Sequence, residues 1–246
     1  MKNLRSSKEL TGYVVHAADG AIGKVRELYF DDADWRVRYI VVDTGRWMPS
    51  KKILLPPATV EDIRWEQRQV RVSFTREQVK KSPKADTDKP VAEQLKAERR
   101  SQHNWALSLA GEALASVPEA LQTPVFEPIN RNGKPFDPHL RTTRVVTGLT
   151  LRARDGTVGR IDDLIVDDGS WEIRYLVVEI KGGERVAVPA RLVKDIIVDE
   201  KVATTDLPLR VLTDAPSLDP STLFTCQYEE SILRHYQPGR QAQASL

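Results

Sequence analysis

The sequence predicts a mainly β protein made of two small antiparallel barrels, a partly helical linker between them and a C-terminal helix. Three observations support this fold class. The chain of 246 residues repeats itself once, each copy alternates short apolar runs with turn signals, and the segments outside the copies contain helix formers and prolines. Evenly spaced strand and turn signals are typical of antiparallel sheets, and closure into a barrel protects sheet edges.

The repeat aligns residues 11–43 with residues 147–179 at a shift of 136, without a gap. Fourteen of the 33 aligned positions are identical, among them Gly23/Gly159, Trp35/Trp171 and Tyr39/Tyr175. After a three-residue deletion in the second copy, the match resumes at Pro56/Pro189 and closes at Pro83/Pro216. Two long copies indicate a duplicated domain, because solenoids stack shorter units in larger numbers. We therefore divide the chain into a first barrel, a linker arm, a second barrel and a C-terminal arm, at residues 1–83, 84–141, 142–216 and 217–246.

Each copy is expected to begin with a hairpin. In the first, TGYVVHA leads into Asp19-Gly20, a dipeptide suited to a tight hairpin turn. IGKVRELYF predicts a strand with an irregularity near Gly23. After an Asp-rich turn, WRVRYIVVD first alternates and then becomes continuously apolar, which indicates a strand buried on one face and later on both. Further strands are predicted at Lys52–Leu55 and Val70–Phe74, and the second copy repeats the plan.

The remaining segments differ in composition. Residues 82–90 are polar and Pro-containing, residues 91–116 are rich in helix formers, and residues 124–139 carry four prolines. Residues 226–236 predict a short helix with an apolar stripe suited to packing on a barrel: Tyr228, Ile232 and Tyr236. Each barrel is thus followed by a polar arm and a helix, and we interpret these arms as part of the duplication.

Motifs in a fixed order occur twice: T-G-Y-V-V at 11–15, D-G-A-I-G at 19–23, D-D-A-D-W at 31–35 and R-Y-I-V-V-D-T-G at 38–45, then D-G-T-V-G at 155–159, D-D-G-S-W at 167–171 and R-Y-L-V-V at 174–178. This pattern resembles the PRC-barrel family. The resemblance implies the barrel found in the photosynthetic reaction-centre H subunit, in a ribosome maturation factor and in stand-alone bacterial proteins. It also implies a binding and assembly module without a shared catalytic residue.

Composition excludes several classes. There are 37 Lys and Arg against 35 Asp and Glu, a formal charge of +2, and hydrophobic residues make up 40% of the chain, which is ordinary for a globular protein. Cys226 is the single cysteine, so no internal disulfide is available. The first ten residues lack the apolar stretch of a signal peptide, and no apolar run is long enough to span a bilayer. We expect a cytoplasmic protein with no membrane-spanning segment.

No catalytic constellation, metal site or cofactor motif is predicted, and we expect the protein not to be an enzyme. P-loop, dinucleotide-binding and nucleophile-elbow motifs are absent from the sequence. The histidines lack the spacing of a helical zinc site. The Asp-rich segment at 31–34 fails the register of a calcium loop, because Trp35 follows it. We interpret it as a turn in which Asp side chains accept hydrogen bonds from nearby backbone amides.

One segment is a candidate partner-binding surface, because the second copy lacks it. It contains a Trp-Met pair flanked by basic residues: Arg46, Trp47, Met48, Lys51 and Lys52. Trp and Arg are enriched in interface hot spots, and Met adapts to varied partners. The alternative is that Trp47 folds back to cap its own barrel. The recurring Trp35/Trp171 and Tyr39/Tyr175 pairs are interpreted as barrel core or rim.

Three functions are compatible with these observations. The first is a non-catalytic interaction or scaffold protein with an unknown protein partner. The second is an RNA- or ribosome-associated factor using the basic first barrel, where 16 Lys and Arg against 11 Asp and Glu give +5 over residues 1–83. The third, by family analogy alone, is a peripheral accessory of photosynthetic electron transfer. The barrels are expected to pair, either as a pseudo-dimer within one chain or in a homodimer.

Overall fold

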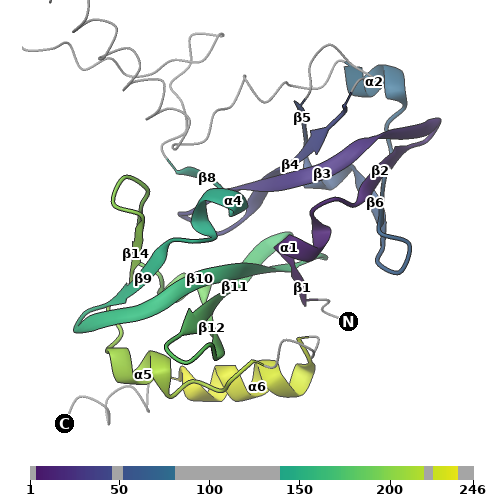
Figure 1. Cartoon of the computed structure of the whole chain (residues 1–246). Helices are drawn as coiled ribbons and strands as arrows, with labels where there is room; N and C mark the ends of the chain where they lie inside the picture. The colour runs from purple at the N-terminus through teal and green to yellow at the C-terminus, as the bar shows by residue number, and fades with distance from the viewer. Residues whose placement is uncertain (1–3, 46–51, 81–138, 219–223, 238–246) are drawn as a thin grey trace, which may run out of the picture.

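The computed structural model describes residues 4–45, 52–80, 139–218 and 224–237. It contains two seven-stranded sheets, each built mainly from one copy of the repeat, which confirms the mainly β class with two barrel-like units. Figure 1 shows the two sheets packed against each other, with the short helices α1 (Ser7–Leu10) and α4 (Thr143–Val146) between them. Among the described helices, none has the length and apolar character needed to cross a membrane.

The first barrel follows the strand order β5-β4-β3-β2-β7-β6. Its elements are β2 (Val14–Ala17), β3 (Gly20–Asp31), β4 (Val37–Asp43), β5 (Lys52–Leu55), the 3-10 turn η1 (Pro57–Thr59), β6 (Val60–Arg64), β7 (Gln69–Val72) and α2 (Arg76–Lys80). The Asp19-Gly20 dipeptide forms the predicted hairpin turn between β2 and β3. The irregularity predicted near Gly23 is present as a register shift between these strands.

The second barrel has the matching order β12-β11-β10-β9-β14-β13. Its elements are β9 (Thr150–Ala153), β10 (Gly156–Asp167), β11 (Glu172–Ile180), β12 (Arg185–Pro189), η2 (Ala190–Leu192), β13 (Asp195–Ile197), β14 (Val202–Thr204) and α5 (Leu209–Thr213). Strand order and element lengths therefore repeat closely between the two copies.

One detail differs from the predicted architecture, which was antiparallel throughout. In each sheet one neighbouring pair is parallel, β2 with β7 and β9 with β14. The reason lies in the connection after the fourth strand. Strands β5 and β6 lie at opposite ends of the strand order, and so do β12 and β13. The 3-10 turns η1 and η2, which connect these strands, are therefore not hairpin turns between neighbouring strands. The alternation of strand direction is interrupted there, so the last hairpin returns parallel to the first strand.

The two barrels exchange their lead strands. Strand β1 (Leu4–Ser6), which precedes the first barrel, pairs with β10 of the second. Strand β8 (Leu140–Thr142), which precedes the second barrel, pairs with β3 of the first. The registers are equivalent, because Ser6 lies opposite Ile165 and Thr142 lies opposite Tyr29, each shifted by 136 residues. The sequence left two arrangements open, and the structure shows the pairing within one chain; self-association of chains stays a prediction.

Most buried apolar residues of both barrels belong to one continuous cluster, while Tyr29, Val41, Leu54 and Leu140 form a second, smaller one. Helix α6 (Cys226–His235) covers part of the second barrel as predicted, with Ile232 and Tyr236 buried in the larger cluster and Tyr228 packed against it. Tyr175 stacks on Phe224 of the same arm at a centroid distance of 5.0 Å. Residues 81–138, which include most of the linker and its expected helices, lie outside the described residues, so the proposed duplication of the arms stays a prediction.

Two glycines allow neighbouring strands to approach each other closely. A Cβ atom on Gly23 would lie 2.3 Å from the backbone oxygen of Asp43, and one on Gly159 would lie 2.0 Å from that of Glu179. Both distances are far below van der Waals contact with atoms that cannot move aside without breaking the ladder. The repeat therefore preserves glycine at 23 and 159 for steric reasons.

Replacing Gly159 by alanine is expected to lower the free energy of unfolding by about 1–3 kcal/mol, the usual cost of overpacking. Gly169→Ala is the matched control, because its Cβ would meet only the Asp167 carboxylate, at 3.3 Å. Urea denaturation of both variants measures the difference. Equal losses of stability in the two proteins would contradict the steric role of Gly159.

Candidate functional site

A cleft with a cavity volume of about 780 Å³ lies where the two barrels meet. Its walls come from α1, α4, the first half of β3 and the residues that end β4. Four of its lining residues are basic: Lys8, Lys24, Arg26 and Arg144. Glu27 and Asp43 are its carboxylates. The site is therefore a composite, because neither copy of the repeat provides all of its walls.

The exchanged lead strands position the short helices that border the cleft. At the end of β1 the Ser6 hydroxyl caps α1 by accepting a hydrogen bond from the Glu9 amide at 3.1 Å. At the end of β8 the Thr142 hydroxyl accepts one from the Val145 amide at 3.0 Å. Such caps satisfy amides that a helix start leaves without partners. Each strand thus delivers a helical turn to the opposite barrel.

A buried carboxylate fixes α1 on the second barrel. The Asp163 side chain accepts hydrogen bonds from both serine hydroxyls at the start of α1, Ser6 and Ser7, with a distance of 2.9 Å for Ser7. It also accepts one from the Lys8 amide at 3.2 Å. Burial raises the pKa of the Asp163 carboxyl, although these hydrogen bonds act in the opposite direction. In the other copy the Thr143 hydroxyl accepts a hydrogen bond from the Leu28 amide at 3.1 Å. The two seams between the copies, α1 against β10 and α4 against β3, therefore both contain buried polar contacts.

The repeated tryptophans lie at a second contact between the barrels. The Val37 amide donates to the Trp171 carbonyl at 2.8 Å, and the Ile173 amide donates to the Trp35 carbonyl at 2.7 Å. Both tryptophans have positive φ angles, 60° for Trp35 and 56° for Trp171, a conformation that costs free energy for residues other than glycine. The reciprocal hydrogen bonds offset that cost. As predicted, these residues belong to the core and rim, with Trp35 7% exposed.

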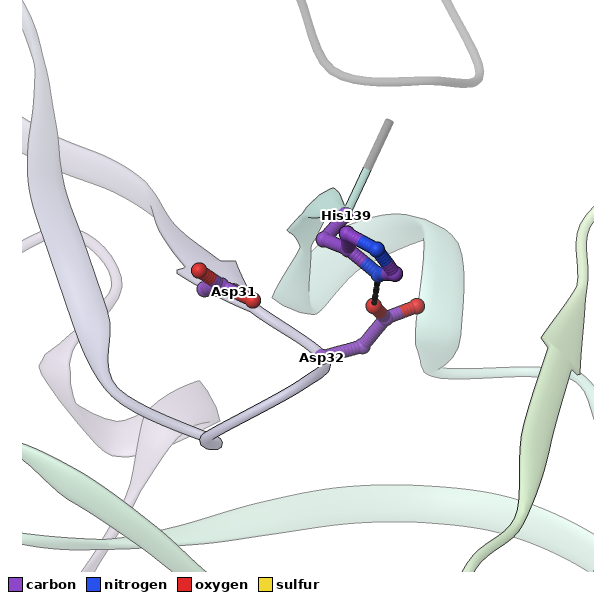
Figure 2. Close-up of side chains that lie close together, drawn as sticks. All are labelled: Asp31, Asp32 and His139. Carbon is purple, nitrogen blue, oxygen red and sulfur yellow. Dashed lines mark hydrogen bonds and ion pairs between the residues drawn. The ribbon is translucent and has the colours of Figure 1, made fainter. Parts of the chain in front are cut away.

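The Asp-rich turn lies beside β8. Figure 2 shows the His139 ring facing the Asp32 carboxylate, with Nδ1 2.8 Å from Oδ1. Arg141 Nε lies 2.7 Å from the other oxygen of Asp32, and Arg38 lies 2.8 Å from Asp31. Burial raises the pKa of Asp32, while the charge of Arg141 acts in the opposite direction. The cluster is thus an ion-pair network between β3 and β8.

Asp31, Asp32 and His139 are also the described residues that could hold a metal ion, because their ligand atoms lie within 4.8 Å of one another. A cation there would compete with two guanidinium groups that already neutralise the carboxylates. The expected turn geometry is confirmed, since the Asp31 side chain accepts a hydrogen bond from the Ala33 amide at 2.9 Å. This arrangement is explained by ion pairing without a metal.

The predicted partner-binding residues lie mostly outside the described part of the chain. Arg46, Trp47, Met48 and Lys51 are not described, and Lys52 is the first residue of β5. Residues 43–45, which precede this segment in the sequence, line the cleft.

Sequence reasoning missed the cleft residues Lys8, Arg26 and Arg144. The repeat did contain a signal, because the aligned positions 26 and 162 carry opposite charges. The sequence alone does not show that each of these positions lies beside a short helix of the other copy. The identity-rich alignment also begins at residue 11, after Lys8.

Fold and cleft define a class of protein: a duplicated, mainly β chain whose two barrels form one body around a shared seam. The PRC-barrel domain family matches this chain over residues 5–79 and again over residues 146–210, which together exceed half of its length. The chain therefore belongs to the PRC-barrel family, as a tandem member. No curated protein matches it.

The raised pKa of Asp163 predicts a specific pH dependence. The folded protein keeps this proton to a higher pH than the unfolded chain, whose carboxyl titrates near 3.8. Stability is therefore expected to fall as the pH rises from 3.8 through the folded-state pKa. Asp163→Asn removes that titration and should flatten the curve in this range. Urea denaturation over a pH series tests this, and parallel curves for the two proteins would contradict it.

Proposed function

We propose that this protein is a non-catalytic interaction or scaffold module. The observation that carries the proposal is the reciprocal exchange of β1 and β8, which joins two barrels into one body with a composite cleft. A surface that needs both copies gives a tandem protein a binding capacity that separate barrels lack. Membership in the PRC-barrel family supports the proposal, since the resemblance implies an assembly module.

The proposal does not include catalysis. The carboxylates with raised pKa values are engaged in structural contacts, Asp163 with the start of α1 and Asp32 with His139 and Arg141. Cys226, the first residue of α6, is exposed. A catalytic acid or base needs a free reactive face beside a substrate pocket, whereas the Asp163 and Asp32 carboxylates are engaged in contacts between the two copies.

Partner binding is proposed to use the segment that follows the cleft residues 43–45 in the sequence. Its Trp-Met pair and basic residues have the composition of an interface hot spot, and its absence from the second copy makes it a local addition to the fold. Residues 43–45, which directly precede it in the sequence, line the cleft.

Trp47→Ala is expected to reduce recovery of a co-purifying partner by tenfold or more, the effect of losing about 1.4 kcal/mol of binding free energy. Ile197→Ala is the matched control, because it removes an exposed apolar side chain, 37% exposed, from the second barrel. Quantitative mass spectrometry of material captured on the full-length proteins provides the measurement. Equal recovery with wild type and Trp47→Ala would contradict the proposed role of this segment.

RNA binding is the second candidate, favoured by the cleft cations Lys24 and Arg26 of the first barrel. It predicts a gel shift with single-stranded RNA at low ionic strength that weakens as salt rises. Lys24→Glu should weaken it further. The test requires the full chain, because each barrel contains a strand from the other copy. Absence of a shift at low salt would exclude this candidate.

A further inference from the structure

The second barrel contains an ion-paired carboxylate opposite α1. Asp162, on β10, pairs with the Lys8 ammonium group of α1. Its other carboxylate oxygen lies 3.3 Å from Arg185 Nε on β12. One anion therefore lies between two cations, all three of them residues of this chain.

The same place in the first barrel has the opposite charge. The equivalent registers of the exchanged strands place Arg144 of α4 where the other copy has Lys8, and Arg26 of β3 where it has Asp162. A cation thus faces a cation at the position where the second barrel has an ion pair. Both arginines line the 780 Å³ cleft.

Within the part of the chain that the structure describes, these arginines have no counterion. Arg26 and Arg144 are exposed, and neither forms an ion pair with any residue that the structure describes. The same holds for Lys24 within the described ranges. Like charges that share a cleft repel each other, and an anion between them is attracted by both.

The cleft keeps a positive surplus after its carboxylates are counted. Four lining cations against two lining carboxylates leave +2. Glu27 is only 6% exposed, so little of it reaches the open space. Lys8 is already neutralised by Asp162, which is not a lining residue, so Lys24, Arg26 and Arg144 against the two lining carboxylates leave a surplus of +1.

We propose that this cleft binds an acidic segment of a protein partner, with a carboxylate held between Arg26 and Arg144. The external carboxylate would take the place that Asp162 has in the second barrel. Guanidinium groups bind carboxylates through paired hydrogen bonds, which gives both charge and orientation. This inference deepens the proposed interaction function and rests on it.

The shape and lining of the cleft favour a peptide over a nucleic acid. Its volume is in the range that accommodates a short peptide segment. Among the described residues that line it, none is aromatic, whereas proteins that bind single strands stack bases on aromatic side chains. The cations also cluster at one place instead of following a long backbone track.

The test uses full-length protein and a fluorescein-labelled oligoglutamate peptide of about six residues, a length chosen to match the cleft. Fluorescence anisotropy should show binding that weakens with salt, and no binding of the matched oligoglutamine peptide. Arg26→Asp supplies an internal partner for Arg144, as Asp162 does for Lys8. We expect this variant to bind oligoglutamate at least about tenfold more weakly and to remain as stable as wild type in urea denaturation. Arg26→Ala should weaken binding as well.

The matched control is Arg152→Asp, which makes the same charge change at an exposed arginine of β9 away from the cleft lining. It should bind oligoglutamate within about twofold of wild type, since charges beyond a Debye length are screened. Equal weakening in Arg152→Asp and Arg26→Asp would show a nonspecific charge effect and overturn the cleft assignment. Binding of oligouridylate in place of the peptide, lost in Arg26→Asp, would overturn the acidic-segment assignment. Failure of oligoglutamate to bind, while Trp47→Ala still abolishes partner recovery, would refute this inference and leave the interaction function standing.

Discussion

The exchange of lead strands is the constraint on which the rest of the structure depends. Each barrel completes its sheet with three residues from the other copy, so neither reaches its final hydrogen bonding alone. The same strands continue directly into α1 and α4, whose caps and buried polar contacts then fix the seam. The shared core and the composite cleft follow from this exchange, because the two copies cannot separate without losing ladder hydrogen bonds and exposing apolar surface.

Backbone symmetry at the seam contrasts with side-chain asymmetry. The strand registers and the tryptophan hydrogen bonds are equivalent in the two copies. The side chains are not, because Asp162 has Arg26, of opposite charge, as its counterpart. The contacts of Arg141 and its counterpart Arg5 also differ, since Arg141 pairs with Asp32 and Arg5 lies 4.6 Å above the Trp65 ring. Backbone pairing tolerates such divergence, since ladder hydrogen bonds do not depend on exposed side chains. Function is therefore expected to differ between the copies while the fold remains common.

Much of the fold could be predicted from the sequence because it depends on local and repeated signals. The Asp19-Gly20 turn, the β5 strand and the stripe on α6 are each encoded within a few residues. The exchanged strands and the parallel pairs could not be predicted in this way. They depend on which distant segments meet, and three-residue strands such as β1 carry no periodicity that names a partner. The cleft was missed for the same reason, because its residues come from segments 136 positions apart.

Duplication within one chain allows an arrangement that two identical chains cannot have. In a symmetric homodimer every seam residue occurs twice, so a change from carboxylate to arginine would remove the counterion at both seams. Here the second seam keeps Lys8 paired with Asp162, which stabilises the contact, while the first has Arg26 and Arg144 without an internal partner among the described residues. The seam of α1 against β10 can then hold the two barrels together, while the seam of α4 against β3 remains available for binding. This difference between the two seams follows from the opposite charges at positions 26 and 162.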